Sequence, residues 1–383
     1  MRYVIWGGLA LVALSLAGFG AWLWRLPAPV AANAPPVPQA EMDAMLAALK
    51  PPKRARPLVA IVGINDATET NDYLMPAGIL RRADIADVKL LATEEGPVKL
   101  YPVLAVEPDA TIAEFDADNP DGADYVVVPA MSRDDDPAVM AWLQRQAQKG
   151  AVVISVCAGA KVIGAAGLLD GKRATTHWYY RDQLLEQNQS IRYVADRRIV
   201  VDGSVATTTG ITASMPMMLT LIEAIAGRQK AESVANEIGL PGWDARHASA
   251  AFSFTRPFAA TVLGNVLAFW NREELGLKLR SGMDEVSVAL VADAWSRTYR
   301  SRARTVAATA GAVATRNGIR IVPDEISRDW PARKLISTFP DSKPAQALDE
   351  TLAAIASRYG DGTSSIVAMQ LEYPARREAD VAN

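Results

Sequence analysis

Short apolar runs alternate with helical patterns in the part of the chain that follows residue 56. The runs Leu58–Gly63, Tyr125–Pro129 and Ala151–Val156 are fully or almost fully apolar and are bounded by turn residues. Such runs are typical of buried strands. The spacing from Ala138 to Lys149 predicts a helix that ends at Gly150. Alternating strands and helices predict an α/β domain with a mostly parallel sheet covered on both faces.

The amino end has a different pattern. From Tyr3 to Trp24 there are 22 residues without a charge, and at about 1.5 Å each they reach roughly 33 Å, enough for a bilayer core of about 30 Å. This predicts a transmembrane helix in residues 1–25. The alternative is a cleaved secretory signal, since Ala32-Asn33-Ala34 has a small-x-small pattern. The basic residues near the helix favour a soluble body outside the cytoplasm, in the periplasm.

The length of the chain, 383 residues, favours two domains behind that anchor. Residues 26–56 are rich in proline and alanine and predict an extended linker. We expect a first α/β domain in residues 57–238 and a second unit in residues 239–376.

Composition excludes several classes of function. A net charge of −3 provides no basic surface of the kind that nucleic-acid binding needs. One cysteine and two histidines exclude an intrachain disulfide and are too few for a zinc site of Cys and His ligands. We therefore expect no nucleic-acid partner, no metal and no cofactor.

The single cysteine lies at a position suited to catalysis. Ser155-Val156-Cys157-Ala158-Gly159 places the thiol where a buried strand turns sharply into a helix, with small residues around it. This is the form of a nucleophile elbow. Free N–H groups at such a helix start favour the thiolate, so we expect a lowered thiol pKa. The alternative is a small buried structural cysteine.

Other groups could support this thiol. His177 follows it by twenty residues, and Asp66, Glu69 and Asp72 lie between the first strand and the first helix, at the same edge of the sheet. A carboxyl group near a thiol can orient it and change its titration. The spacing does not choose among the three acids.

Two stretches resemble the ThiJ/PfpI family of the class I glutamine amidotransferase-like superfamily: SVCAGAKVIGAAGLLDGKRATTHW from Ser155 and TTTGITASMPMMLTLIEAIAG from Thr207. They are most similar to the amidase-like domains of AraC-type regulators and to isonitrile hydratases. The resemblance covers about residues 57–235 and implies a flavodoxin-like three-layer sandwich. It also implies Cys157 as nucleophile with His177 beside it. The family's acid lies four positions before a proline, which selects Asp72 before Pro76, with Glu69 as runner-up.

The resemblance further implies where an oxyanion would be held. One donor is the backbone N–H of Ala158, and the other comes from the turn at Ala130 and Met131, where many relatives have two glycines. Ala130 and Met131 predict a narrower and more apolar pocket. Thr209, in the second stretch, is assigned to the same pocket.

The last third of the chain repeats the order of the first domain. A helix from Met283 and a strand from Thr305 precede Pro323-Asp324, as in the first domain a helix near Asp72 and a strand precede Pro108-Asp109. Asp284 is thereby aligned with Asp72. We expect further strands at 334–339 and 365–371, and a helix at 344–359. The hypothesis is a degenerate half-copy without a nucleophile; the alternative is ordinary α/β alternation.

Together these observations predict a membrane-anchored, cysteine-dependent hydrolase or lyase. Its substrate would be a small molecule with an electrophilic amide, aldehyde or isonitrile carbon. Asp72 would orient the thiol and His177 would shuttle protons. A ligand or redox sensor that uses the same cysteine without turnover is the second hypothesis, and a structural partner protein is the third. The resemblance also implies a homodimer.

Overall fold

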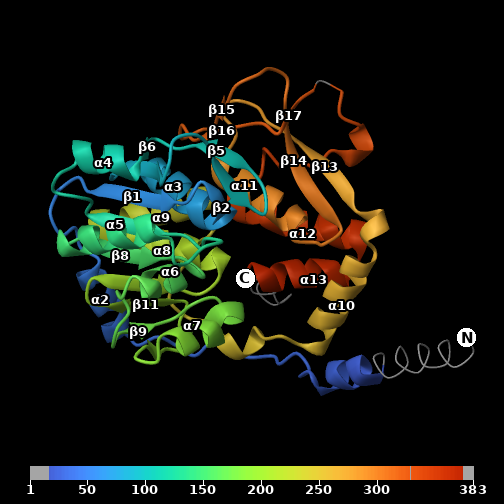
Figure 1. The fold of residues 1–383 in the computed structure, drawn as a ribbon, viewed down its shortest axis with the longest axis horizontal. Helices are drawn as coiled ribbons and strands as arrows, with labels where there is room; N and C mark the ends of the chain where they lie inside the picture. The colour runs from blue at the N-terminus through green and yellow to red at the C-terminus, as the bar shows by residue number, and fades with distance from the viewer. Residues whose placement is uncertain (1–16, 328, 374–383) are drawn as a thin grey trace, which may run out of the picture.

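A computed structural model describes residues 17–327 and 329–373 (Figure 1). Its main sheet has seven strands in the order β11-β12-β8-β7-β1-β3-β6, and all neighbours are parallel except β11 and β12. Their bounds in chain order are β1 (Leu58–Gly63), β3 (Asp87–Ala92), β6 (Ala110–Thr111), β7 (Tyr125–Val128), β8 (Val152–Ser155), β11 (Ile199–Asp202) and β12 (Val205–Thr208). The predicted mostly parallel sheet is confirmed.

Helices cover both faces of this sheet. The strands at its centre, β1, β7 and β8, are buried along their whole length, so their apolar runs need cover on each side. One face packs on α3 (Thr70–Ala83), α8 (Ser214–Ala226) and α9 (Arg228–Ile238), and the other on α4 (Ile112–Asp118), α5 (Pro137–Gln148) and α6 (Gly159–Ala165). The three-layer, flavodoxin-like sandwich is confirmed.

The amino-terminal predictions need correction. In the described ranges, 17–327 and 329–373, no helix is both long enough and apolar enough to cross a membrane, so the predicted transmembrane helix is not supported. Its first part, residues 1–16, lies outside the described residues. The predicted extended linker contains helix α2 (Gln39–Ala48), because Met45 and Leu49 are buried in the main core. The predicted location of the soluble body stays a prediction.

The last third of the chain adds a smaller α/β unit, seen at the right and top of Figure 1. Its sheet has the order β13-β14-β17 and is parallel. Helix α11 of this unit packs on α3 of the first. The bounds of the unit are β13 (Glu273–Lys278), α11 (Glu285–Ser296), β14 (Ser301–Ala307), β15 (Val313–Ala314), β16 (Arg320–Ile321), β17 (Glu325–Ile326), α12 (Pro344–Tyr359) and α13 (Asp361–Gln370).

Three details of the predicted repeat were wrong. Residues 334–339 form no strand beyond one bridge at Leu335, and the segment expected as a strand at 365–371 lies in helix α13. The residue that caps α3 is Glu69, and the residue that caps α11 is Asp284. Asp284 therefore corresponds to Glu69, and the predicted alignment with Asp72 is three residues out of register. The predicted helix at 344–359 is confirmed as α12.

A small second sheet joins the two units. It has the order β15-β16-β5-β4-β2, in which β2 (Asp66–Glu69), β4 (Val98–Tyr101) and β5 (Ala105–Glu107) come from the first unit. Figure 1 shows β5, β15 and β16 together above α11. Helix α10 (Arg256–Leu267) lies before the second unit in the sequence and packs on its helix α13. The second unit therefore lies against the edge where the sheet strands of the first unit end.

Candidate active site

Cys157 lies in the sharp turn between β8 and α6, as predicted from its sequence context. Its φ is +57°, a left-handed conformation that non-glycine residues adopt rarely and that is often found at functional sites. Its backbone N–H donates to Thr208 Oγ1 at 3.2 Å. A Cβ on Gly159 would lie 2.0 Å from the carbonyl oxygen of Val128, so only glycine lets α6 start this close to β7. Neighbouring strands thus hold the turn in place.

The environment of the thiol is less favourable to the thiolate than the sequence predicted. Cys157 is 4% exposed. Burial raises its pKa well above the ordinary value, and the charges of Asp72 and Glu69 raise it further. The N–H of Ala158 contacts the sulfur and lowers the pKa, as expected of an elbow donor. With Asp72 and Glu69 both charged, the pKa of the Cys157 thiol is therefore raised. The lowered pKa expected from the sequence is not found.

Asp72 is completely buried and holds the turn after β7. Its Oδ2 accepts from the N–H of Ala130 at 3.1 Å, and its carboxyl group also forms a side-chain hydrogen bond with that of Glu69. Burial raises the pKa of Asp72 to about 7. Two consequences follow: the Ala130 N–H is already engaged with a carboxylate, and Asp72 titrates in the range where a general base works best.

Glu69 joins the same cluster from the N-cap position just before α3. Its Oε2 accepts from the Asp72 N–H at 2.6 Å, and its Oε1 forms an ion pair with Arg297 at 2.6 Å. Burial and the charges of Asp72 and Asp293 raise the pKa of Glu69 well above its usual value, although Arg297 lowers it. Because three carboxyl groups share one guanidinium away from water, at least one of them keeps its proton near neutral pH.

His177 lies in the site, but both of its ring nitrogens are engaged. Nε2 is 3.0 Å from the carbonyl oxygen of Gln370, and Nδ1 accepts from the N–H of Tyr179 at 3.1 Å. A carbonyl only accepts and an N–H only donates, so these partners select the neutral ring with its hydrogen on Nε2. Burial lowers the pKa of His177, which favours the same neutral form.

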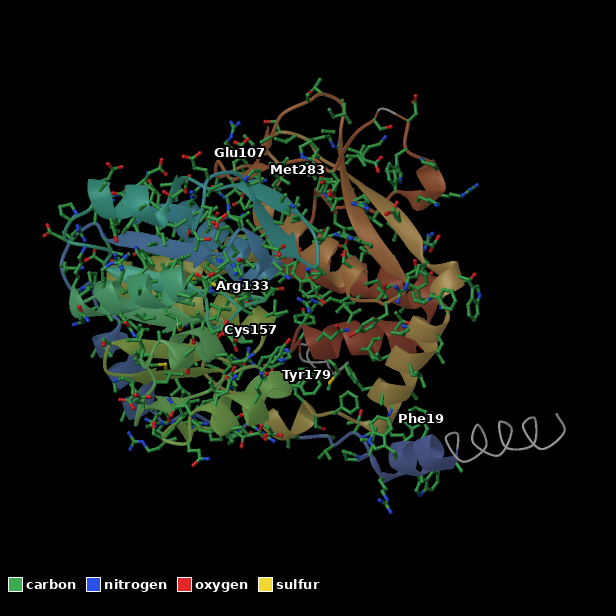
Figure 2. All side chains as sticks on the ribbon, in the orientation of Figure 1. Phe19, Glu107, Arg133, Cys157, Tyr179 and Met283 are labelled. Atoms are coloured by element: carbon green, nitrogen blue, oxygen red, sulfur yellow. The ribbon has the colours of Figure 1, made fainter. Side chains whose placement is uncertain are left out.

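A cavity of about 620 Å³ opens next to these groups. Figure 2 labels Cys157 and Tyr179 near the middle of the molecule, by the end of α13. The cavity wall includes Cys157, Glu69 and His177, together with aromatic side chains from both units: Tyr101, Trp178, Tyr179, Tyr180, Phe254, Phe258 and Tyr299. Such a wall favours apolar or aromatic ligands.

The other predicted pocket residues divide into two groups. Ala130 and Met131 line the cavity, and Ala158 lies beside the sulfur. Thr209 is buried but is not in the cavity wall; its neighbour Thr208 is the residue that contacts Cys157. The structure therefore brings Cys157, Asp72, Glu69 and His177 into one site and leaves Thr209 outside it.

Three residues of this site come from the second unit and were missed from the sequence. Arg297 follows α11 and pairs with Glu69, while Gln370 contacts His177. Glu372 accepts from the N–H groups of Trp178 at 2.7 Å and Gly210 at 2.5 Å. All four contacts join residues more than 160 positions apart, so no local pattern could have indicated them. Across the described ranges, no three or more His, Cys, Asp or Glu side chains form a group that could hold a metal ion.

Comparison with known proteins identifies the first unit. Residues 59–224 match the DJ-1/PfpI family. This part of the chain is a DJ-1/PfpI family domain. An isonitrile hydratase from Pseudomonas putida is 45% identical over 100 residues, which are 26% of this chain and 42% of that protein. A Parkinson disease protein 7 homolog from Danio rerio is 28% identical over 181 residues, 46% of this chain and 93% of that protein.

A solved structure also resembles this DJ-1/PfpI domain. A DJ-1 superfamily protein from Salmonella typhimurium is 27% identical, with a TM-score of 0.43, and the match covers 49% of this chain and all of that one. The family match ends at residue 224, before α9 and the second unit.

Proposed function

We propose that this protein is a cysteine-dependent enzyme that acts on a small, largely apolar molecule with an electrophilic carbon. The observation that carries the proposal is the buried cluster of Cys157, Asp72 and Glu69 beside an aromatic cavity. A nucleophile, a carboxyl group with a pKa of about 7 and a largely apolar cavity are the parts that covalent catalysis on a small molecule needs. Amide, aldehyde and isonitrile carbons are the candidate electrophiles.

Asp72 is the group best placed to take the thiol proton. It is completely buried, its one side-chain hydrogen-bond neighbour is the Glu69 carboxyl, and its charge raises the pKa of Cys157 more than that of any other side chain. In the proposed first step the thiol proton moves to Asp72 and the sulfur bonds to the substrate carbon. The electron pair displaced from that carbon moves to its oxygen or nitrogen, beside the N–H of Ala158. With an aldehyde this step gives the hemithioacetal oxyanion, and return of the proton from Asp72 to that oxygen gives the neutral hemithioacetal.

A sensor without turnover is the second candidate, and one observation favours it. Burial raises the pKa of Cys157 well above its usual value, so the resting thiol is poorly reactive until a ligand or a protonation change alters the site. Under this proposal ligand binding or oxidation at Cys157 would change the structure without releasing a product.

A substrate panel separates the two candidates. The full chain and its Cys157→Ser variant are incubated with aromatic glyoxals, amides and isonitriles, and product formation is followed by mass spectrometry. Multiple turnovers that disappear in Cys157→Ser support the enzyme. Binding without turnover, seen as a stable adduct or a shift in melting temperature with the wild type alone, supports the sensor. Turnover that persists in Cys157→Ser rules out both.

A further inference from the structure

The second unit repeats the first in an almost constant register. Each element of the second unit from β13 to β17 has a counterpart in the first, in the same order, and all but one of them begin 215 positions after that counterpart. The exception is β14, which begins 214 positions after β3. The corresponding pairs are β1 and β13, α3 and α11, β3 and β14, β4 and β15, β5 and β16, and β6 and β17. Chance alternation of strands and helices would not preserve this spacing.

A specific side-chain contact recurs at the same interval. In the first unit the Leu90 N–H donates to Asp109 Oδ2 at 2.7 Å. In the second unit the Thr305 N–H donates to Asp324 Oδ2 at 2.8 Å. Both residues of the second pair lie 215 positions after those of the first, so the two units share local detail as well as topology.

The two units meet about an approximate two-fold axis. Strands β5 and β16 pair in antiparallel orientation, and Val106 lies opposite Ile321, its own counterpart 215 positions later. Helices α3 and α11 are also counterparts, and they pack on each other. A residue that faces its own counterpart is the geometry of an isologous interface between two copies of one chain.

Two ion pairs across this interface are reciprocal. Arg82 of the first unit pairs with Asp284, the capping residue of α11. Arg297 of the second unit pairs with Glu69, the capping residue of α3, at 2.6 Å. Arg297 corresponds to Arg82 and Asp284 to Glu69, again 215 positions apart. All four side chains are largely buried.

We propose that residues 273–326 are a half-copy of the first unit, which occupies within one chain the place of a second copy and positions Glu69 through Arg297. The half-copy covers the free edge of β5 and supplies Arg297 and Tyr299 to the cavity wall. A second chain therefore has no access to this face. The homodimer predicted from the family resemblance stays a prediction and would need another surface.

Arg297 is the cation in contact with Glu69. The other charged or titratable groups that act on Glu69 are Asp72 on the same helix and Asp293 on α11, and Cys157 lies across from it. Arg297 also pairs with Asp293 at 2.8 Å. Its removal therefore leaves the carboxyl cluster without its counter-ion, whereas removal of Arg82 changes an equivalent pair that does not touch the cavity.

A disulfide trap tests whether the half-copy that covers the edge of β5 belongs to the same chain as β5. Glu107 and Arg320 face each other across β5 and β16, and their side chains are 39% and 56% exposed. The full-length double variant Glu107→Cys/Arg320→Cys, with Cys157→Ser, is oxidised with diamide at several protein concentrations. We expect a disulfide within monomers at every concentration, and none in Glu107→Cys/Cys157→Ser. Covalent dimers from the double variant, or no disulfide in folded protein, would overturn the proposal.

Matched arginine variants test the positioning role. The pH profile of Cys157 alkylation by iodoacetamide is compared in full-length wild type, Arg297→Gln, Arg297→Lys and Arg82→Gln. Because Arg297 lowers the pKa of Glu69 and Asp72, its loss should move the carboxyl step of the profile at least half a unit to higher pH. Arg297→Lys keeps the charge and should restore most of the wild-type profile, and Arg82→Gln should leave it unchanged. Equal profiles for Arg297→Gln and Arg82→Gln would contradict the role.

Discussion

The two α/β units keep similar backbones but differ in chemistry. In the first unit Asp72 is buried and its charge acts on Cys157, and the cavity wall is largely aromatic. The position 215 residues later is Ser287, and it faces a second cavity of about 420 Å³ lined with charged side chains such as Arg280 and Arg316. The same helix start therefore supports a carboxyl cluster in one unit and a solvent-accessible polar cavity in the other.

The difference between the units separates the elements that hold the two units together from the elements that position the cysteine. The half-copy ends before any counterpart of β7 and β8, so it has no strand that could lead into a cysteine elbow. It keeps the contacts that hold the two units together, including Arg297 with Glu69. The retained features thus serve the interface, and the proposed nucleophile Cys157 and acid Asp72 occur only in the first unit.

The largest expected effect is a loss of kcat on substitution of Asp72, with no comparable loss on substitution of its counterpart Ser287. If Asp72 takes the thiol proton, Asp72→Asn should lower kcat by about 10² to 10⁴-fold for the substrate found in the panel. Ser287→Ala, at the corresponding position, should stay within about two-fold of wild type. Steady-state kinetics on both variants measures this, and equal effects of the two changes would remove the distinction between the units.

The Asp72→Asn change that lowers kcat should raise the stability of the folded protein. Burial raises the folded-state pKa of Asp72 from 3.8 to about 7, so between these values the folded state binds more protons and the free energy of unfolding falls as pH rises. At pH 8 Asp72→Asn should be more stable than wild type by up to about 4 kcal/mol, with little difference at pH 4. Urea unfolding at both pH values tests this; a less stable variant at pH 8 would contradict it.

The cavity walls should differ in their effect on substrate binding. Phe258→Ala removes an aromatic side chain from the wall of the first cavity and should raise KM about ten-fold, with a smaller change in kcat. Phe339→Ala removes the corresponding type of side chain from the second cavity and serves as the matched control. A similar rise in KM for both variants would show a general loss of packing.

The smallest expected effect is at His177. Because both of its ring nitrogens have backbone partners, His177→Asn should change kcat by less than about three-fold. Circular dichroism would check that the variant is folded. A loss of a hundred-fold or more in a folded variant would establish His177 as the proton shuttle expected from the sequence.

Local patterns predicted the first unit well. The apolar runs that became β1, β7 and β8 are short and continuous, which is how strands in a parallel sheet read. The position of Cys157 followed from one of these runs and the small residues after it. The spacing alone did not choose among Asp66, Glu69 and Asp72; the family resemblance selected Asp72 with Glu69 as runner-up, and the structure brings both into the site.

The missed features depend on contacts between distant parts of the chain. The segment that became α13 has apolar residues that suit a strand or a helix, and packing on α10 and α12 selects the helix. In the sequence nothing distinguishes Arg297 from a surface arginine. Its ion pair with Glu69 depends on the packing of α11 on α3. The raised pKa of Cys157 follows from burial, which a cysteine's sequence neighbours do not reveal.

The most direct test of the site is the rate of Cys157 alkylation as a function of pH, in the wild type and in Asp72→Asn. If Asp72 controls the thiol, the wild-type profile should contain a step near pH 7, from the pKa of about 7 that burial gives this carboxyl, in addition to the step of the thiol itself. The step near pH 7 should disappear in Asp72→Asn. Identical profiles for the two proteins would contradict the account.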